Sequence, residues 1–239
     1  MSRLLLLRHA QASYLEPNYD KLSATGERQA RVLGEYWARH KINFDRVFSG
    51  PRVRQMDTAR IVAAACREAG HAFPEPVVHQ EFNEYDGEAI LKHALPQLLE
   101  SDAEIRALHQ AYLDTSPPAD RSKTFQKVVE AVIDMWVAGE IVVPGVESWP
   151  EFTARVNRGL SQIISGARRG ECSVVFSSGG PIAIGMQRAL NLSAQDTLRV
   201  AWMSRNCSYS EFLFSGERFT LSAFNAFPHL EDGTLLTYR

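Results

Sequence analysis

The stretch that decides the fold is Leu4-Leu5-Leu6-Leu7-Arg8-His9-Ala10-Gln11, close to the start of the chain. Four consecutive leucines predict a short strand that is buried on both faces. An arginine and a histidine follow at once, as they would where the C-terminal end of a strand opens into the ligand crevice of an α/β sheet. The stretch therefore predicts the first strand of such a sheet and half of an active site. The alternative is a polar loop in which His9 is merely packed.

Strands and helices alternate along most of the rest of the chain. This alternation predicts an α/β fold, in which a single doubly wound, mainly parallel sheet is flanked by helices. Residues 1–239 are expected to form one domain, with a helical insertion at about 89–139 and an antiparallel edge made by a terminal hairpin. Further strands are expected at 45–49, 76–79, 172–176, 207–214 and 218–224, and helices from about 22, at about 51–69, about 149–167 and 182–190.

The composition is that of an ordinary globular protein. Apolar residues make up 45% of the 239 residues, charged residues 23%, and the net charge is -2. A net charge this small creates no strong positive electrostatic potential that would attract nucleic acid or anionic membranes. No apolar run in the sequence approaches the length of a membrane span. Three scattered cysteines are too few for a disulfide framework or a zinc site. We therefore expect a cytoplasmic protein with no nucleic-acid or membrane partner.

Two strand-to-helix junctions carry features that suit an anion. Arg52 and Arg54 fall in the first turn of a predicted helix, where the helix dipole disfavours cations unless an anion binds there. The alternative is a pair of solvated arginines. The turn Ser177-Ser178-Gly179-Gly180-Pro181 leads from a buried strand into the next helix and exposes backbone N–H groups, as anion sites do.

These motifs together resemble the histidine phosphatase superfamily, also called phosphoglycerate mutase-like. The resemblance rests on Leu-x-Arg-His at the first strand, Leu-Ser-x-x-Gly-x-x-Gln-Ala from Leu22, and Ser-x-Pro-x-x-Arg-x-x-x-Thr-Ala from Ser49. The resemblance continues in order with Glu84, the turn at 178–180, and Asn225 with His229-Leu230. It therefore covers nearly the whole chain.

The resemblance implies a role for each motif residue. His9 would attack phosphorus and become phosphohistidine, without a metal or other cofactor. Arg8 and Arg54 would bind the phosphoryl oxygens, which planar guanidinium groups meet well. Glu84 would protonate the leaving oxygen and later activate water, with Glu81 as the alternative acid. Gln11, Ser13, Ser178 and Gly179 are the expected substrate-binding residues.

The chain departs from the family pattern at three places. Ala10 stands where the family usually has glycine, and Gly87 follows Glu84 by three residues instead of four. The larger departure is Ser178, which replaces the usual second histidine before the Gly-Gly pair. A serine hydroxyl can still bond a phosphate oxygen, but it supplies no imidazolium charge. Losing one charged donor could cost on the order of 10²–10³ in rate.

The leading hypothesis is a metal-independent phosphomonoesterase that acts on a small phosphorylated metabolite or a phosphoprotein; an oligomer is possible. A phosphoglycerate-type mutase is a variant of it. A second hypothesis, motivated by Ser178, is a phosphatase-like protein that binds phosphorylated ligands with weak or no turnover. A third is a serine hydrolase built on Ser178, His229 and Asp196, although Phe176 stands where that signature needs glycine.

Overall fold

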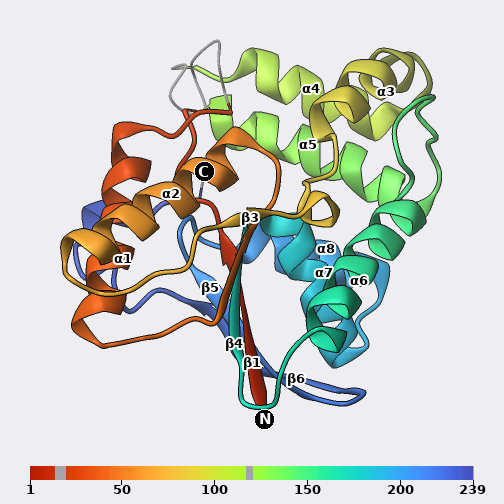
Figure 1. The fold of residues 1–239 in the computed structure, drawn as a ribbon. Helices are drawn as coiled ribbons and strands as arrows, with labels where there is room; N and C mark the ends of the chain where they lie inside the picture. The colour runs from red at the N-terminus through yellow and green to blue at the C-terminus, as the bar shows by residue number, and fades with distance from the viewer. Residues whose placement is uncertain (14–19, 117–120, 239) are drawn as a thin grey trace. The chain divides into compact units, whose positions relative to one another are not determined.

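The computed structural model describes residues 1–13, 20–116 and 121–238. Within these residues a six-stranded sheet has the order β3-β2-β4-β1-β5-β6 (Figure 1). The strands are β1 (Ser2–Arg8), β2 (Arg46–Ser49), β3 (Val77–Val78), β4 (Cys172–Ser177), β5 (Tyr209–Ser215) and β6 (Arg218–Ala226). The helices are α1 (Ala24–Arg39), α2 (Val53–Glu68), α3 (Gly87–Ser101), α4 (Ala103–Asp114), α5 (Arg121–Ala138), α6 (Trp149–Ser165), α7 (Gly179–Leu190) and α8 (Ala194–Met203).

Strand β1 lies inside the sheet, between β4 and β5. It runs parallel to β4, with Leu6 opposite Val175 and Arg8 opposite Ser177, and antiparallel to β5. The pairs β4–β2 and β2–β3 are also parallel, whereas β5 and β6 form the antiparallel hairpin. The predicted mainly parallel sheet with an antiparallel edge is therefore confirmed.

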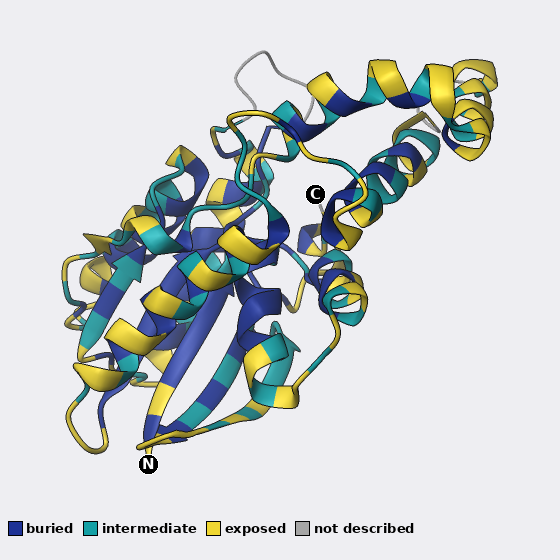
Figure 2. Ribbon diagram, turned by 90° about the vertical axis from the view of Figure 1, so that its right-hand side faces the viewer, coloured by how far each residue is buried: buried dark blue, intermediate teal, exposed yellow. Residues whose placement is uncertain are grey.

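Both faces of β1 are buried, as its four leucines require. Leu5 and Leu7 pack into a core that includes Trp37 of α1 and residues of α2. Leu6 faces α7, where a Cβ added at Gly185 would lie 2.7 Å from its Cδ1 atom. The central strands are correspondingly dark blue in Figure 2. With helices over both faces, only the ends of the strands are left to form a site.

Two helix starts differ from their prediction. The sequence predicts Pro51 as the first helical residue, whereas α2 begins at Val53, because the Arg52 N–H donates to Gln55 Oε1 (3.0 Å) and so makes Arg52 the N-cap. Helix α7 begins at Gly179 and not at Ile182, so the Gly-Gly pair belongs to its first turn and the extended Ser178 precedes it.

Helix α8 has no counterpart in the prediction. It begins after Ser193, whose hydroxyl oxygen accepts the Asp196 N–H (3.1 Å) in an ordinary N-cap. Helix α8 packs against α7. A Cβ added at Gly179 would lie 3.2 Å from the Ala201 carbonyl oxygen of α8.

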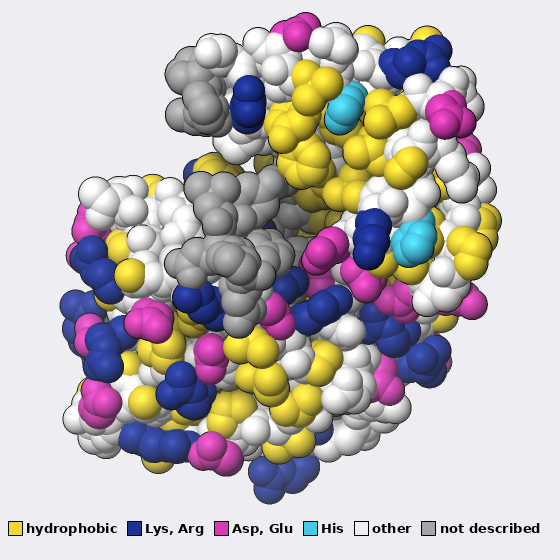
Figure 3. Space-filling view, turned by 90° about the horizontal axis from the view of Figure 1, so that it is seen from above, with side chains coloured by type: hydrophobic (Ala, Val, Ile, Leu, Met, Phe, Trp, Pro, Cys, Tyr) yellow, Lys and Arg dark blue, Asp and Glu magenta, His cyan; other side chains and the backbone are white. Residues whose placement is uncertain are grey.

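The chain divides into two compact units, which are residues 1–84 with 155–239, and residues 85–154. The sheet belongs to the first unit. The second contains α3, α4, α5 and the start of α6, and its core includes an aromatic cluster of Tyr85, Trp136, Trp149 and Phe152. Figure 3 shows apolar side chains gathered on the helices of this second unit, and Leu113 is 52% exposed. No helix in the described ranges is long and apolar enough to cross a membrane.

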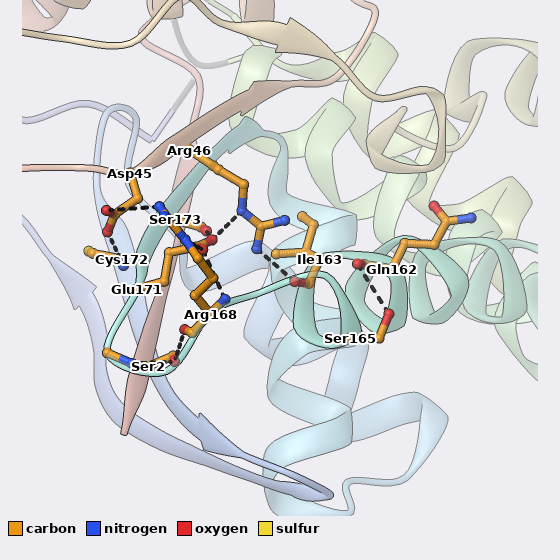
Figure 4. Close-up of polar contacts among 11 residues, drawn as sticks. Ser2, Asp45, Arg46, Gln162, Ile163, Ser165, Arg168, Glu171, Cys172 and Ser173 are labelled. Atoms are coloured by element: carbon orange, nitrogen blue, oxygen red, sulfur yellow. Dashed lines mark hydrogen bonds and ion pairs between the residues drawn. The ribbon is translucent and has the colours of Figure 1, made fainter.

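A polar network joins the N-terminal ends of the central strands, away from the predicted site (Figure 4). Glu171 accepts hydrogen bonds from the Arg46 guanidinium and from the backbone N–H of Arg168. Burial alone would raise the pKa of Glu171, but the bonds from Arg168 and Arg46 outweigh it and lower the pKa. This network fixes where β2 and β4 begin, and so helps to set the register of their far ends.

Candidate active site

The site is built where β1 and β4 end side by side. The His9 backbone N–H donates to the Ser177 carbonyl oxygen (2.8 Å), so the last residue of β4 fixes the first residue after β1. His9 is 4% exposed. Strand pairing thus brings His9 and the Ser178 turn, 169 positions apart in the sequence numbering, to one edge of the sheet.

The contacts of His9 define which of its ring nitrogens reacts. Nδ1 lies 2.8 Å from the Ala10 carbonyl oxygen, and Nε2 lies 3.1 Å from Nε of Arg54. Because arginine can only donate, Nε2 is the acceptor and the ring proton is on Nδ1. Burial, then the charges of Arg54 and Arg8, hold the pKa of His9 well below its usual range. His9 is thus a neutral imidazole with a lone pair on Nε2.

Arg54 also holds a carboxylate that the sequence did not single out. Its Nη1 donates to Asp20 Oδ1 (2.6 Å), and the other Asp20 oxygen accepts the Val53 N–H (2.9 Å). The start of α2 therefore does carry an anion next to Arg54, as the junction predicts, but this anion is a side chain of the chain itself. Asp20 follows a stretch with no motif, so no signal in the sequence marks it.

The Arg8 side chain is held by the segment before β5. Its Nη1 donates to the carbonyl oxygen of Ser204, in the segment that leads into β5. The neighbouring strand thereby helps to fix the guanidinium predicted to bind a phosphoryl oxygen. Its charge also contributes to the lowered pKa of His9.

Ser178 is held by a glutamine that the sequence reasoning missed. The Ser178 hydroxyl is buried and accepts a hydrogen bond from Gln55 Nε2 (2.8 Å). Gln55 follows Arg54 on α2 and also donates to the Phe82 carbonyl oxygen (3.3 Å). Where the family pattern places a histidine, this chain therefore has a neutral Gln–Ser pair.

The two candidate acids have different contacts. Glu84 Oε2 accepts the Gly180 N–H (3.0 Å), so its carboxylate lies at the N-terminus of α7. Glu81 instead pairs with the Nδ1 atom of His79 (2.9 Å). Arg155 of α6 fixes the loop that carries both, because its Nη1 donates to the carbonyl oxygens of Glu81 (2.8 Å) and Asn83 (3.1 Å). Of the two acids, Glu84 is the one that contacts the Gly-rich turn.

Gln11 and Ser13 contact the segment before α1. Gln11 Oε1 accepts the Ser23 hydroxyl (2.8 Å), and the Ser13 hydroxyl donates to the Leu22 carbonyl oxygen (3.1 Å). The packing here is tight, because a Cβ at Gly26 would lie 2.1 Å from the Gln11 carbonyl oxygen. That close approach explains the glycine of the Leu-Ser-x-x-Gly motif. Both predicted substrate contacts thus help to hold the segment after His9.

The contacts of the serine hydrolase candidates lie in three different places. Ser178 is bound by Gln55, while His229 is buried with its ring 6.1 Å from that of Tyr36. Asp196 accepts the hydroxyl of Ser193, the N-cap of α8, and pairs with Arg199 (2.9 Å). These contacts give no support to a triad. Among residues 1–13, 20–116 and 121–238, no cluster of His, Cys, Asp and Glu is arranged to hold a metal ion.

Comparisons with known proteins agree with this geometry. A family model, histidine phosphatase superfamily (branch 1), matches residues 4–140 and 120–226. No curated protein sequence matches the chain.

Several solved structures share the fold. They include the alpha-ribazole phosphatase of Shigella flexneri, with 18% identity, a TM-score of 0.61, and 94% of this chain and 96% of that chain covered. A phosphoserine phosphatase mutant from Entamoeba histolytica has 16% identity and a TM-score of 0.63, with 96% and 100% covered. A phosphoglycerate mutase from Bacillus anthracis has 15% identity and a TM-score of 0.61, with 95% and 94% covered.

Proposed function

Because the chain belongs to the histidine phosphatase superfamily (branch 1), we propose that it hydrolyses phosphomonoesters through a phosphohistidine at His9. The observation that carries the proposal is the state of His9, a buried neutral imidazole whose Nε2 lone pair points at Arg54 Nε (3.1 Å). A neutral imidazole is a nucleophile, and a guanidinium beside it is the partner that a phosphoryl group needs.

When the substrate binds, Arg54 Nε has to leave Nε2 and turn to a phosphoryl oxygen, because one lone pair cannot serve both partners. In the first step Nε2 then attacks phosphorus, and the bond from phosphorus to the ester oxygen breaks. Arg8 binds further oxygens of the same group, and two guanidinium groups compensate the charge of the transferring phosphoryl. The bond from Nδ1 to the Ala10 carbonyl oxygen keeps the imidazole oriented throughout.

Glu84 is the proposed acid and base. It donates a proton to the leaving oxygen, and the alcohol departs. The resulting carboxylate then takes a proton from water as the water oxygen attacks phosphorus, which breaks the N–P bond and releases inorganic phosphate. Its contact with the Gly180 N–H, at the Ser178 turn, supports this role over Glu81, whose carboxylate pairs with His79.

The test is hydrolysis of an aryl phosphate in chelator across pH 5 to 8, with wild type, His9→Ala and the exposed-histidine control His93→Ala. We expect turnover in wild type and in the control, and none in His9→Ala. A rapid acid-free quench with labelled substrate should trap label on wild type that survives base and is lost in acid, as for a phosphoramidate. Undiminished turnover in His9→Ala would contradict the proposal.

A second candidate function, a phosphate-binding protein with little turnover, is favoured by two contacts. Asp20 occupies Arg54, and the neutral Gln55–Ser178 pair replaces a charged donor. In this case inorganic phosphate should raise the melting temperature of wild type although no substrate turns over. The substrate class proposed under either function is a small phosphorylated metabolite or a phosphoprotein. A mutase is the variant in which an alcohol, and not water, accepts the phosphoryl group.

A further inference from the structure

Residues 204–207 are hydrogen-bonded directly to Arg8, the last residue of β1, and to His9, which follows it. The Ser204 carbonyl oxygen accepts the Arg8 Nη1 donor. Asn206 Nδ2 donates to the His9 carbonyl oxygen (3.4 Å), and the Cys207 N–H lies 3.1 Å from the carbonyl oxygen of Arg8 and 3.2 Å from that of His9. Arg205 therefore lies between residues that touch Arg8 and His9, one Cα spacing of about 3.8 Å from each neighbour.

The side chain of Arg205 is held by aromatic rings. Its guanidinium carbon lies 4.3 Å from the ring centroid of Phe227 and 5.1 Å from that of Tyr238. Its backbone N–H donates to the Asn225 side chain (2.8 Å). Contact with aromatic rings occupies the faces of a guanidinium and leaves the N–H groups, which lie in its plane, free to act as donors. Arg205 is thus positioned before any ligand arrives.

Both rings extend from backbone that is anchored in the fold. Phe227 directly follows β6, and Tyr238 follows Thr237, whose carbonyl oxygen accepts the Asn206 N–H (2.9 Å). The Thr237 hydroxyl also accepts a hydrogen bond from the buried Gln29 (2.9 Å). The stacked arrangement is therefore anchored in the fold and does not depend on a loose tail.

This fixed cation has no carboxylate partner in the parts of the chain that the structure describes. Its Nε is buried without an acceptor, and the adjacent Ser204 hydroxyl, 1% exposed, is buried without a partner. Other arginines of the same unit do have acidic partners, as Arg46 has Glu171 and Arg54 has Asp20. A held cation without a carboxylate partner, one residue after the Ser204 carbonyl oxygen that holds the Arg8 guanidinium, is suited to an anion supplied by a ligand.

We propose that Arg205 is a specificity residue that recognises an anionic substituent, a carboxylate or a second phosphate, on the leaving group of the substrate, an inference that rests on the proposed function. Arg8 binds the transferring phosphoryl group, and Arg205, the second residue of the fastened segment 204–207, binds the charge on the departing part. Substrates with a neutral leaving group lack this contact, so the site discriminates against them.

The test uses two non-hydrolysable ligands that differ in one charge, 4-carboxybenzylphosphonate and 4-carbamoylbenzylphosphonate, together with their 3-substituted isomers. Calorimetry on the full chain should give wild type a preference of about 10- to 100-fold for the carboxylate of at least one isomer pair, the size expected of a charge-assisted bond. Arg205→Gln should remove the preference while binding the carbamoyl ligands as wild type does. Arg205→Lys should keep part of it.

The control is Arg199→Gln, an arginine on α8 that pairs with Asp196 and is 77% exposed. It should keep the full preference. No preference in wild type, or an equal loss for both ligands in Arg205→Gln, would overturn the proposal. If the melting curve shows that Arg205→Gln is unfolded, the test uses Arg205→Lys and wild type instead. A smaller carboxylate preference in Arg205→Lys than in wild type supports the proposal, and an equal preference contradicts it.

The two proposals fail in different ways. Hydrolysis of aryl phosphates without a charge preference on the phosphonates contradicts the role of Arg205 and leaves the phosphatase intact. A preference that depends on Arg205, in a protein without turnover, contradicts hydrolysis and keeps the anion site.

Discussion

At the scale of single residues, the proposed reaction requires the substrate to compete with Asp20 for Arg54. The carboxylate holds Nη1 of Arg54 (2.6 Å) and would have to give up that bond, or share it, when a phosphoryl group binds. Asn is isosteric and can still accept the Val53 N–H, so Asp20→Asn removes the charge and keeps the hydrogen bond to the start of α2. We expect inorganic phosphate to inhibit Asp20→Asn about 3- to 10-fold more tightly than wild type, since one competing charge is gone.

The inhibition constant of phosphate, measured at fixed ionic strength, checks this expectation. Asp57→Asn is the control, because Asp57 lies on α2 and pairs with Arg60, and it should not change the constant. An unchanged constant in Asp20→Asn would mean that Asp20 does not restrain Arg54.

The ionisation of His9 also depends on Arg54. Burial is the largest cause of its lowered pKa, and the Arg54 charge is the next. Arg54→Gln should therefore raise the pKa of His9, yet leave it below the ordinary value of 6.5 because burial remains. NMR titration of the His9 ring signals in both proteins measures the two values. An equal or lower pKa in Arg54→Gln would contradict the assigned contact between Nε2 and Arg54.

At the scale of elements, α6 positions the proposed acid. Arg155 bonds two carbonyl oxygens of the loop that ends in Glu84, and the Glu84 carboxylate in turn accepts the Gly180 N–H. Arg155→Gln should loosen this loop and weaken proton donation to the leaving oxygen. We expect kcat to fall about 10-fold for alkyl phosphates, whose leaving oxygens need the proton, and much less for nitrophenyl phosphate, which departs without it.

The measurement is the ratio of the kcat values for the two substrates. A protein that is only destabilised would lose kcat for both substrates by the same factor, and the ratio would not change. Arg158→Gln, an exposed arginine one turn along α6, should leave the ratio unchanged. A uniform loss in Arg155→Gln would mean that Arg155 serves the stability of the protein and not the placement of Glu84.

The elements that the sequence predicts are those with a strong local signal. Leu4–Leu7 lies in β1 because four apolar residues in a row fit only a strand covered on both sides. Helix α8 was not predicted, although Ser193 with Asp196 three residues later is a helix-start signal, because α8 has only ten residues and follows α7 after a short link. The division between α3 and α4 at Asp102 was likewise missed, because an aspartate that caps a second helix looks like one more polar residue.

At the scale of the whole molecule, the site combines residues that the sequence predicts with residues that only the folded structure identifies. Motifs that follow one another in a recognisable order contain His9, Arg8, Arg54 and Glu84, so a resemblance to a family could identify these residues. Asp20, Gln55 and Arg205 act through neighbours that are distant in the sequence, and no spacing relates them. Their contacts depend on how β1, β4 and β5 align, which is a property of the sheet and not of any stretch.

The pH dependence of stability is a second property of the whole chain. His229 is 2% exposed, and its burial, only partly offset by the Cys207 backbone, lowers its pKa from 6.5 to about 4. The folded protein therefore binds fewer protons than the unfolded chain between pH 4 and 6.5. Stability from this group is complete above pH 6.5 and is lost as the pH falls, by about 3 kcal/mol at pH 4. His9, with its own lowered pKa, acts in the same direction.

Urea unfolding of wild type and His229→Phe between pH 7.5 and pH 4 tests this, because a phenylalanine keeps the packing against Tyr36 and cannot titrate. The carboxylates of the chain also titrate in this range, but they contribute equally to both proteins and cancel in the difference. The free energy of unfolding of wild type should fall more steeply than that of His229→Phe below pH 6.5. Parallel curves would show that His229 is protonated in the fold, and its pocket would then have to contain an acceptor for that proton.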